Sequence, residues 1–236
     1  MSSRKFEAWL FGKWGPLEKS LAAWTKDVVW PEEALCCACG RITKGGALCP
    51  ACRESLTYDG SSFAWEPCEP EPGLRAWSLR PHEGVARQLV IRLKHGAEAR
   101  AARLLSELLL PLPEDFILPP ETVVTWVTMP ESRLCERAID HGRMLAELFA
   151  EKLSLPCRQL LFRRDRREKR QATLGAAERS ANLLGAFRPI EKISFPVLIV
   201  DDVRTTGTTL CRCAEALRAG GAEKVFALTV TARGRV

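Results

Sequence analysis

Residues 197–209 read Val-Leu-Ile-Val-Asp-Asp-Val-Arg-Thr-Thr-Gly-Thr-Thr, and this stretch decides the fold. Its four apolar residues in a row are typical of a strand buried on both faces of a parallel sheet. Two carboxylates, Asp201 and Asp202, end the expected strand, and helical spacing begins at Leu210. The turn between them is rich in hydroxyl groups and contains Thr205, Thr206, Gly207, Thr208 and Thr209. The pattern predicts a strand, a ligand-binding turn and a helix.

The chemistry of this turn indicates a ribose phosphate. The N-terminus of a helix offers unpaired N–H groups to a phosphate, and Gly207 lets the backbone approach the ligand closely. Asp201 and Asp202 would repel a phosphate, but carboxylates accept hydrogen bonds from a vicinal diol. The turn lacks the Gly-Lys-Ser/Thr of a P-loop and the glycine pattern of a dinucleotide site. The alternative is a threonine-rich helix cap with no ligand.

Outward from this stretch, helical and strand patterns alternate. Apolar spacing predicts helices near residues 85–93, 104–109, 139–153 and 210–217, and strands at 123–127, 160–162 and 225–230. Alternating strands and helices indicate an α/β domain with a parallel sheet. We divide the chain into a helical segment (1–35), a cysteine-rich unit (36–57), a linker or irregular loop (58–82) and the α/β domain (83–236).

Composition sets the class of protein. The 236 residues are 46% hydrophobic, which excludes a mainly disordered chain. Lys and Arg exceed Asp and Glu by 35 − 29 = 6, a mild excess that suits an anionic partner. No apolar run approaches the roughly 20 residues that span a bilayer, and the N-terminus lacks the apolar core of a signal peptide. We expect a cytoplasmic protein without a membrane span.

Six of the ten cysteines lie between Cys36 and Cys68. Two C-x-x-C pairs separated by nine residues predict a closed, structural Zn²⁺ site. Its ligands would be Cys36, Cys39, Cys49 and Cys52. The alternatives are free buried thiols or a site that has lost its metal, and the parts played by Cys37 and Cys68 stay open. We expect the remaining four to be core thiols, namely Cys135, Cys157, Cys211 and Cys213.

Residues 197–210 resemble the binding signature for 5-phosphoribosyl 1-pyrophosphate (PRPP) in type I phosphoribosyltransferases. The whole chain resembles the ComF family, in which a cysteine-rich N-terminal segment precedes such a domain. The matching segments are Trp30-Pro31 with Cys36-x-x-Cys39-Gly40, Leu93-Lys94-His95-Gly96, Met129-Pro130-x-x-Arg133-x-x-x-Arg137, Gln171-x-x-Leu174 and Arg179-x-x-Asn182-x-x-Gly185-Ala186-Phe187. The resemblance implies a Rossmann-like type I phosphoribosyltransferase core behind a small zinc ribbon.

The resemblance also implies a chemistry. A nucleophile would attack C1 of PRPP, with Mg²⁺ bound together with the substrate. Asp201 and Asp202 would hold the ribose diol, Thr205–Thr209 the 5-phosphate, and Arg133, Arg137 and, more weakly, Lys94 the pyrophosphate. Family members are linked to competence, the uptake of DNA. The alternative is a non-catalytic sensor or scaffold that binds a ribose phosphate, single-stranded DNA or competence proteins, since no segment resembles a nucleobase-binding element.

Three further features of the sequence each allow more than one role. The basic stretch Arg163–Arg170 is a solvated loop, a loop that closes over pyrophosphate, or a contact for a nucleic-acid backbone. Arg204 replaces an uncharged residue of the family and either reaches an anion or points into solvent. Ala138 replaces a glycine of the family, so the chain either transfers the phosphoribosyl group or only binds PRPP.

Overall fold

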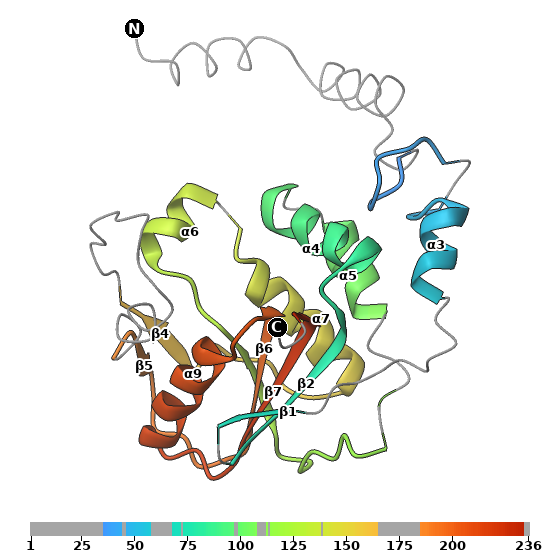
Figure 1. Ribbon diagram of the computed structural model, residues 1–236. Helices are drawn as coiled ribbons and strands as arrows, with labels where there is room; N and C mark the ends of the chain where they lie inside the picture. Colours follow the sequence, from blue (N-terminus) through green and yellow to red (C-terminus); the bar gives the residue numbers. More distant parts are fainter. Residues whose placement is uncertain are drawn as a thin grey trace, which may run out of the picture.

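A computed structural model describes residues 35–43, 46–57, 68–71, 73–96, 99–107, 112, 114–137, 139–164 and 185–233 (Figure 1). The helical segment predicted for residues 1–35 lies outside this part except for Leu35, as do residues 165–170 of the basic stretch. Within the described residues, no helix has the length and apolar character needed to cross a membrane.

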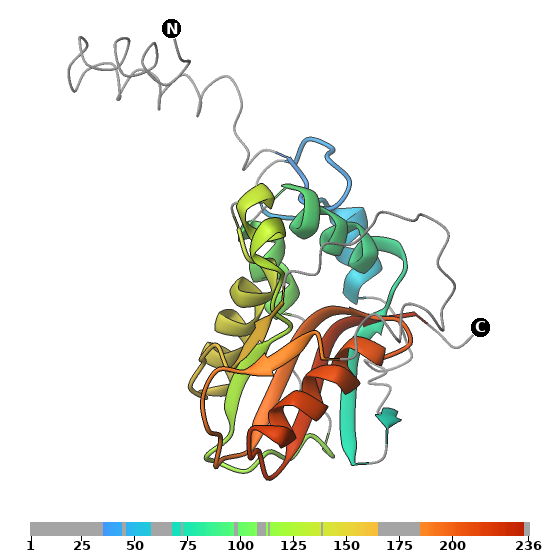
Figure 2. The same cartoon turned by 90° about the vertical axis from the view of Figure 1, so that its left-hand side faces the viewer.

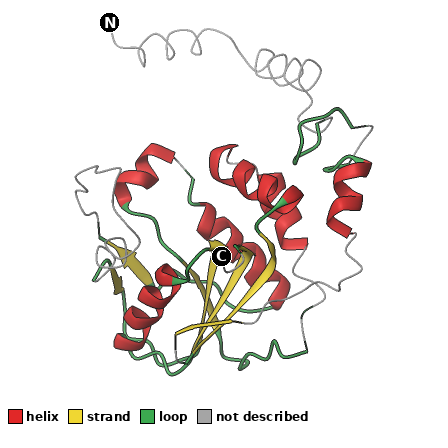
Figure 3. Cartoon of the chain, in the orientation of Figure 1, coloured by secondary structure: helices red, strands yellow, loops and turns green. Residues whose placement is uncertain are grey.

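A five-stranded sheet forms the centre of the molecule (Figure 3). Four of its strands are parallel, and only the edge strand β1 is antiparallel. In spatial order the strands are β1 (Cys68–Glu71), β2 (Leu74–Pro81), β7 (Val225–Ala232), β6 (Val197–Arg204) and β3 (Val123–Trp126). The parallel sheet predicted from alternating patterns is therefore confirmed.

Residues of the four parallel strands pack into two separate cores, one on each face of the sheet. Leu198 and Val200 of β6 belong to the core that includes residues of the helices before residue 160, whereas Val197 and Ile199 belong to the core under α9. Figure 2 shows these helices on opposite sides of the sheet. The helices on the first face are α4 (Gly84–Gly96), α5 (Ala99–Glu107) and α7 (His141–Leu153). The other face is covered by α9 (Thr208–Ala219) and by the hairpin of β4 (Leu161–Arg163) and β5 (Phe187–Pro189).

The predicted linker at residues 58–82 is wrong for its second half. Residues 68–71 and 74–81 form β1 and β2, and β2 pairs with β7 over most of its length. The acidic, proline-rich residues before β2 dominated the composition of this stretch. Because Trp77, Ser78 and Leu79 are all buried, β2 also lacks the alternation of a half-exposed strand.

The cysteine-rich unit shares the core of the α/β domain. Cys36, Leu48 and Cys52 pack in the same cluster as Leu89 and Leu93 of α4. The helix α3 (Pro50–Thr57) begins between the two cysteines of the second pair, and α6 (Glu131–Arg137) follows β3. The unit is therefore braced against the domain that it precedes.

Candidate functional site

The carboxyl ends of β2, β7, β6 and β3 meet at one edge of the sheet, where open α/β sheets bind ligands. Helix α4 lies above the ends of β6 and β7 in Figure 1. Asp201 and Asp202 stand near the end of β6, and both are half-buried. This edge therefore combines a sheltered acid pair with the start of a helix.

Lys94 of α4 makes an ion pair with Asp202. Its Nζ lies 2.9 Å from Asp202 Oδ1, and the two side chains are 34% and 16% exposed. The pair is thus partly withdrawn from water, where charge attraction is stronger than at an open surface. Lys94, which the resemblance assigned weakly to pyrophosphate, is brought directly to the acid pair.

Asp201 has different surroundings from its neighbour. Its Oδ1 accepts a hydrogen bond of 2.9 Å from the Asp202 amide. Burial and the charge of Asp202 raise the pKa of Asp201 to about 7, although Lys94 and Arg163 act in the opposite direction. The raised pKa favours the protonated carboxyl of Asp201, which can donate as well as accept a hydrogen bond.

The turn after the acid pair is shorter than the sequence predicted. Strand β6 continues to Arg204, and α9 already begins at Thr208. Three residues, Thr205–Gly207, connect the two, and Gly207 has a φ of +79° that favours glycine. The continued ladder with β7, including the pair Val203 and Thr231, explains the longer strand.

The N-terminus of α9 is open to an anion. Gly207 caps the helix without a side-chain hydrogen bond, and the first turn contains no acidic residue. Thr206 Oγ1 lies 2.8 Å from Thr208 Oγ1, so two hydroxyl groups gather beside the first turn. The Thr208 amide donates to Thr206 Oγ1 at 3.4 Å. The next N–H groups of the first turn have no partner within the helix, so they suit a phosphate.

Arg204 is held along the sheet. Its Nε donates to Ser78 Oγ at 3.3 Å, and Ser78 Oγ lies 2.8 Å from Thr229 Oγ1. The hydrogen bond anchors Arg204 to β2, so the guanidinium does not simply point into solvent.

The two arginines predicted for pyrophosphate belong to α6, which follows β3 at the same edge. Arg133 is exposed on this helix. Arg137 is its last residue, and the described part of the chain does not include the Arg137 side chain. Both arginines therefore belong to the helix that follows β3.

The residues that depart from the family pattern around Ala138 include a helix cap. Asp140 caps α7 by accepting a hydrogen bond of 3.1 Å from the Arg143 amide. Its other oxygen accepts a hydrogen bond of 2.9 Å from Trp126 Nε1. Asp140 therefore fastens α7 to the end of β3.

Sequence reasoning missed His82. The residue follows β2 directly at the carboxyl edge, and its Nδ1 lies 2.8 Å from Thr231 Oγ1 of β7. No motif or spacing marked it, because its position at the site depends on the pairing of β2 with β7.

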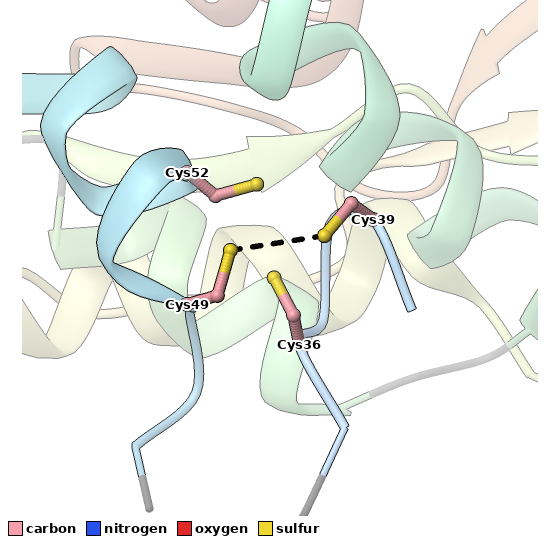
Figure 4. Close-up of side chains that lie close together, drawn as sticks. All are labelled: Cys36, Cys39, Cys49 and Cys52. Atoms are coloured by element: carbon pink, nitrogen blue, oxygen red, sulfur yellow. Dashed lines mark hydrogen bonds between the residues drawn. The ribbon is translucent and has the colours of Figure 1, made fainter. Parts of the chain in front are cut away.

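The four cysteines of the two C-x-x-C pairs converge (Figure 4). Their sulfur atoms all lie within 4.8 Å of one another, and the Sγ atoms of Cys39 and Cys49 are 3.8 Å apart. Ligands about 2.3 Å from a tetrahedral Zn²⁺ stand about 3.8 Å from one another. The donor set therefore fits a metal ion, as predicted, and Cys37 is not part of it.

Arg41 contacts this cluster. Its Nε donates to Cys39 Sγ at 3.3 Å, and this hydrogen bond lowers the pKa of Cys39 to about 6. Burial instead raises the pKa of Cys52 to about 12. A metal bound here would hold both as thiolates, because thiolate is the form that coordinates.

The other cysteines differ from the prediction in one case. Cys213 is buried, and Cys157 and Cys211 are partly buried, but Cys135 is exposed on α6 and is not a core thiol. The side chain of Cys68 lies outside the described part of the chain.

Comparisons with known proteins bear on the fold and the relatives of this chain. Residues 140–235 match the family model of the phosphoribosyl transferase domain. The chain is 29% identical to the DNA utilization protein YhgH of Salmonella typhi over 81% of its length and 87% of that protein. It is 25% identical to competence protein F of Haemophilus influenzae over 82% of its length and 88% of that protein.

A solved structure, orotate phosphoribosyltransferase from Aeropyrum pernix, is 23% identical over 63% of this chain and 66% of that chain, with a TM-score of 0.37. The family match and the sequence relatives carry the assignment, and together they confirm the predicted resemblance. The chain is therefore similar to competence protein F over most of its length, its residues 140–235 match the phosphoribosyl transferase domain, and its N-terminal four-cysteine cluster fits a zinc ribbon.

Proposed function

We propose that this protein binds PRPP together with Mg²⁺ at the carboxyl edge of the sheet and transfers its phosphoribosyl group to an acceptor. The observation that carries the proposal is the succession of the acid pair near the end of β6 and the glycine-capped N-terminus of α9, with only residues 203–207 between them. The acid pair suits a diol and the helix N-terminus suits a phosphate, and a ribose 5-phosphate has both groups.

The residues divide the substrate between them. Asp201 and Asp202 would bind the ribose hydroxyls, and Thr205, Thr206, Gly207, Thr208 and Thr209 would bind the 5-phosphate. Arg133 and Arg137 would bind pyrophosphate from the β3 side. Lys94 would hold Asp202 in place and offer its remaining N–H donors to the pyrophosphate, because an ammonium group has three.

Transfer would proceed by displacement at C1. Positive charge develops on the ribose as pyrophosphate leaves, and Asp201 and Asp202 would stabilise it. Mg²⁺ would neutralise charge on the leaving pyrophosphate. Positioning and charge stabilisation would supply much of the rate.

We propose that the metal held by Cys36, Cys39, Cys49 and Cys52 is a structural Zn²⁺. Four protein ligands leave no open position for water, so the site has no catalytic coordination position. Its effect would be to fix the cysteine-rich unit against α4.

A second candidate function follows from the names of the relatives, which refer to DNA utilization and competence. In this alternative, the protein acts in the cytoplasm in DNA uptake as a non-catalytic ribose-phosphate sensor or scaffold. Its partners would be single-stranded DNA or competence proteins. The basic stretch, of which Arg163 and Arg164 are described, would contribute to binding the DNA backbone.

Calorimetric titration with PRPP and Mg²⁺ tests the proposal, and pyrophosphate release separates transfer from binding. A shift in the electrophoretic mobility of single-stranded DNA on addition of the protein, weaker at higher salt, would favour the second candidate.

A further inference from the structure

A chain of hydrogen bonds connects three strands at the carboxyl edge. The His82 amide donates to Ala232 O at 2.7 Å, and His82 Nδ1 lies 2.8 Å from Thr231 Oγ1. The Thr231 hydroxyl donates to Asp202 O at 3.3 Å. The imidazole is therefore tied through β7 to the strand that carries the acid pair.

This chain sets the tautomer of His82. A hydroxyl group has one proton, and Thr231 gives its proton to Asp202 O. Both contacts of Thr231 are satisfied together only when His82 Nδ1 donates, which leaves a lone pair on Nε2. Burial, assisted by Arg233, Arg87 and Lys94 and opposed by Asp202, lowers the pKa of His82 and favours the neutral ring.

The order of the strands places His82 on one side of Asp201 and Asp202. Arg133 follows β3, next to β6, whereas His82 follows β2, on the other side of β6 beyond β7. Two strand spacings, about 9.6 Å, separate β2 from β6, so His82 and Arg133 lie on opposite sides of the acid pair. In a direct displacement the nucleophile approaches C1 from the face opposite the leaving group. With pyrophosphate on the β3 side, the acceptor belongs on the side of β7 and β2.

Resting on the function proposed above, we propose that His82 binds the acceptor. Its Nε2 accepts a hydrogen bond from an N–H group of a nitrogen nucleophile, such as a heterocycle or an amine. As the acceptor nitrogen bonds to C1, the bond from C1 to the pyrophosphate oxygen breaks and the electron pair leaves with pyrophosphate. The acceptor proton passes to Nε2. His82 is thus a catalytic residue on the acceptor side, and Thr231 is a positioning residue.

The test uses His82→Asn in the full, zinc-loaded chain. The Asn amide can take the place of Nδ1 and keep the contact with Thr231, but it has no counterpart of Nε2. PRPP and Mg²⁺ are titrated by calorimetry, and pyrophosphate release is measured with adenine, hypoxanthine, uracil, orotate and ammonium as probe acceptors. Glu83→Gln, an exposed neighbour in the same turn, is the matched control.

We expect His82→Asn to bind PRPP within about twofold of wild type, because His82 contacts the acceptor and not PRPP. Pyrophosphate release should fall by about 10²–10⁴-fold, and the acid limb of the kcat/KM profile should disappear. Release at the wild-type rate by His82→Asn would overturn the inference, as would a wild type that binds PRPP but releases no pyrophosphate with any probe. Failure of wild type to bind PRPP would instead contradict the proposed function itself.

Discussion

Lys94 Nζ of α4 lies 2.9 Å from Asp202 Oδ1 of β6, so a helix that follows β2 supplies the counter-charge for the acid pair two strands away. Adjacent carboxylates repel each other, and this ion pair offsets part of that repulsion in the absence of a ligand. The contact also fixes α4 above the carboxyl edge. The charge balance of the site and the position of its covering helix are therefore linked.

Removing the charge of Lys94 should destabilise the fold. Lys94→Met keeps the apolar stem but leaves Asp202 partly buried without its cation. We expect the free energy of unfolding at pH 8 to fall by about 1 kcal/mol. For a chain of this length, that lowers Tm by about 2–4 °C, as measured by calorimetry.

A double-mutant cycle shows whether this loss belongs to the pair. In the Asp202→Asn background, Lys94→Met should cost much less, because its partner is already neutral. Lys94→Arg, which retains the charge, is the control. Equal losses in both backgrounds would contradict the pairing.

The stability of the protein should depend on pH through Asp201. Its pKa is raised from 3.8 to about 7, so the folded chain holds a proton that the unfolded chain releases between these values. This contribution to stability is fully present below about pH 4 and is lost as the pH rises through about 7.

The difference in free energy of unfolding between Asp201→Asn and wild type should therefore shift in favour of the variant by about 1–2 kcal/mol as the pH rises from 5 to 8. Urea unfolding at the two pH values measures the difference. If the difference in free energy of unfolding between Asp201→Asn and wild type stays constant with pH, a raised pKa of Asp201 is not its cause.

Replacing Gly207 should affect both the stability of the fold and the affinity for PRPP. Gly207→Ala places a side chain at a φ of +79°, which costs about 1–2 kcal/mol. It also crowds the place where a phosphate would approach, so PRPP affinity should fall about tenfold or more through the loss of a hydrogen bond to a charged group.

Gly185→Ala is the matched control, because Gly185 has a φ of +66° and open space around its Cβ position. It should lose similar stability and keep its PRPP affinity. If both variants bind PRPP equally well, the turn before α9 is not the phosphate site.

The four-cysteine cluster should hold one Zn²⁺ per chain. Cys49→Ser removes one ligand and should abolish stoichiometric zinc in the purified protein. Because Cys49 and Cys52 pack in the core shared with α4, Tm should fall as well. Cys135→Ser, a change of an exposed thiol on α6, should retain both properties. Elemental analysis and thermal unfolding decide between these results, and full zinc content in Cys49→Ser would contradict the assignment.

The sequence predicted those parts whose signals are local. The apolar run 197–200 and the helical spacing from Leu210 identified β6 and α9, and the spacing of the C-x-x-C pairs identified the four cysteines that converge. Each of these features depends on residues within a short stretch of chain, where periodicity and ligand spacing carry the information.

The missed features depend on contacts across the sheet. Strand β2 was mistaken for a loop because its neighbours are rich in Glu and Pro, and its burial becomes visible only beside β7. The pairing of Lys94 with Asp202 requires α4 to lie over the carboxyl edge. His82 reaches the site through Thr231, which is 149 residues away in the chain.

Binding of PRPP with Mg²⁺, measured by calorimetry on the wild type and on the double variant Asp201→Asn/Asp202→Asn, tests the central claim most directly. The account predicts that the folded, zinc-loaded wild type binds and that the double variant loses at least about 100-fold in affinity, equivalent to about 2.7 kcal/mol. A folded, zinc-loaded wild type that does not bind PRPP, or a double variant that binds it equally well, would contradict the ribose-phosphate site.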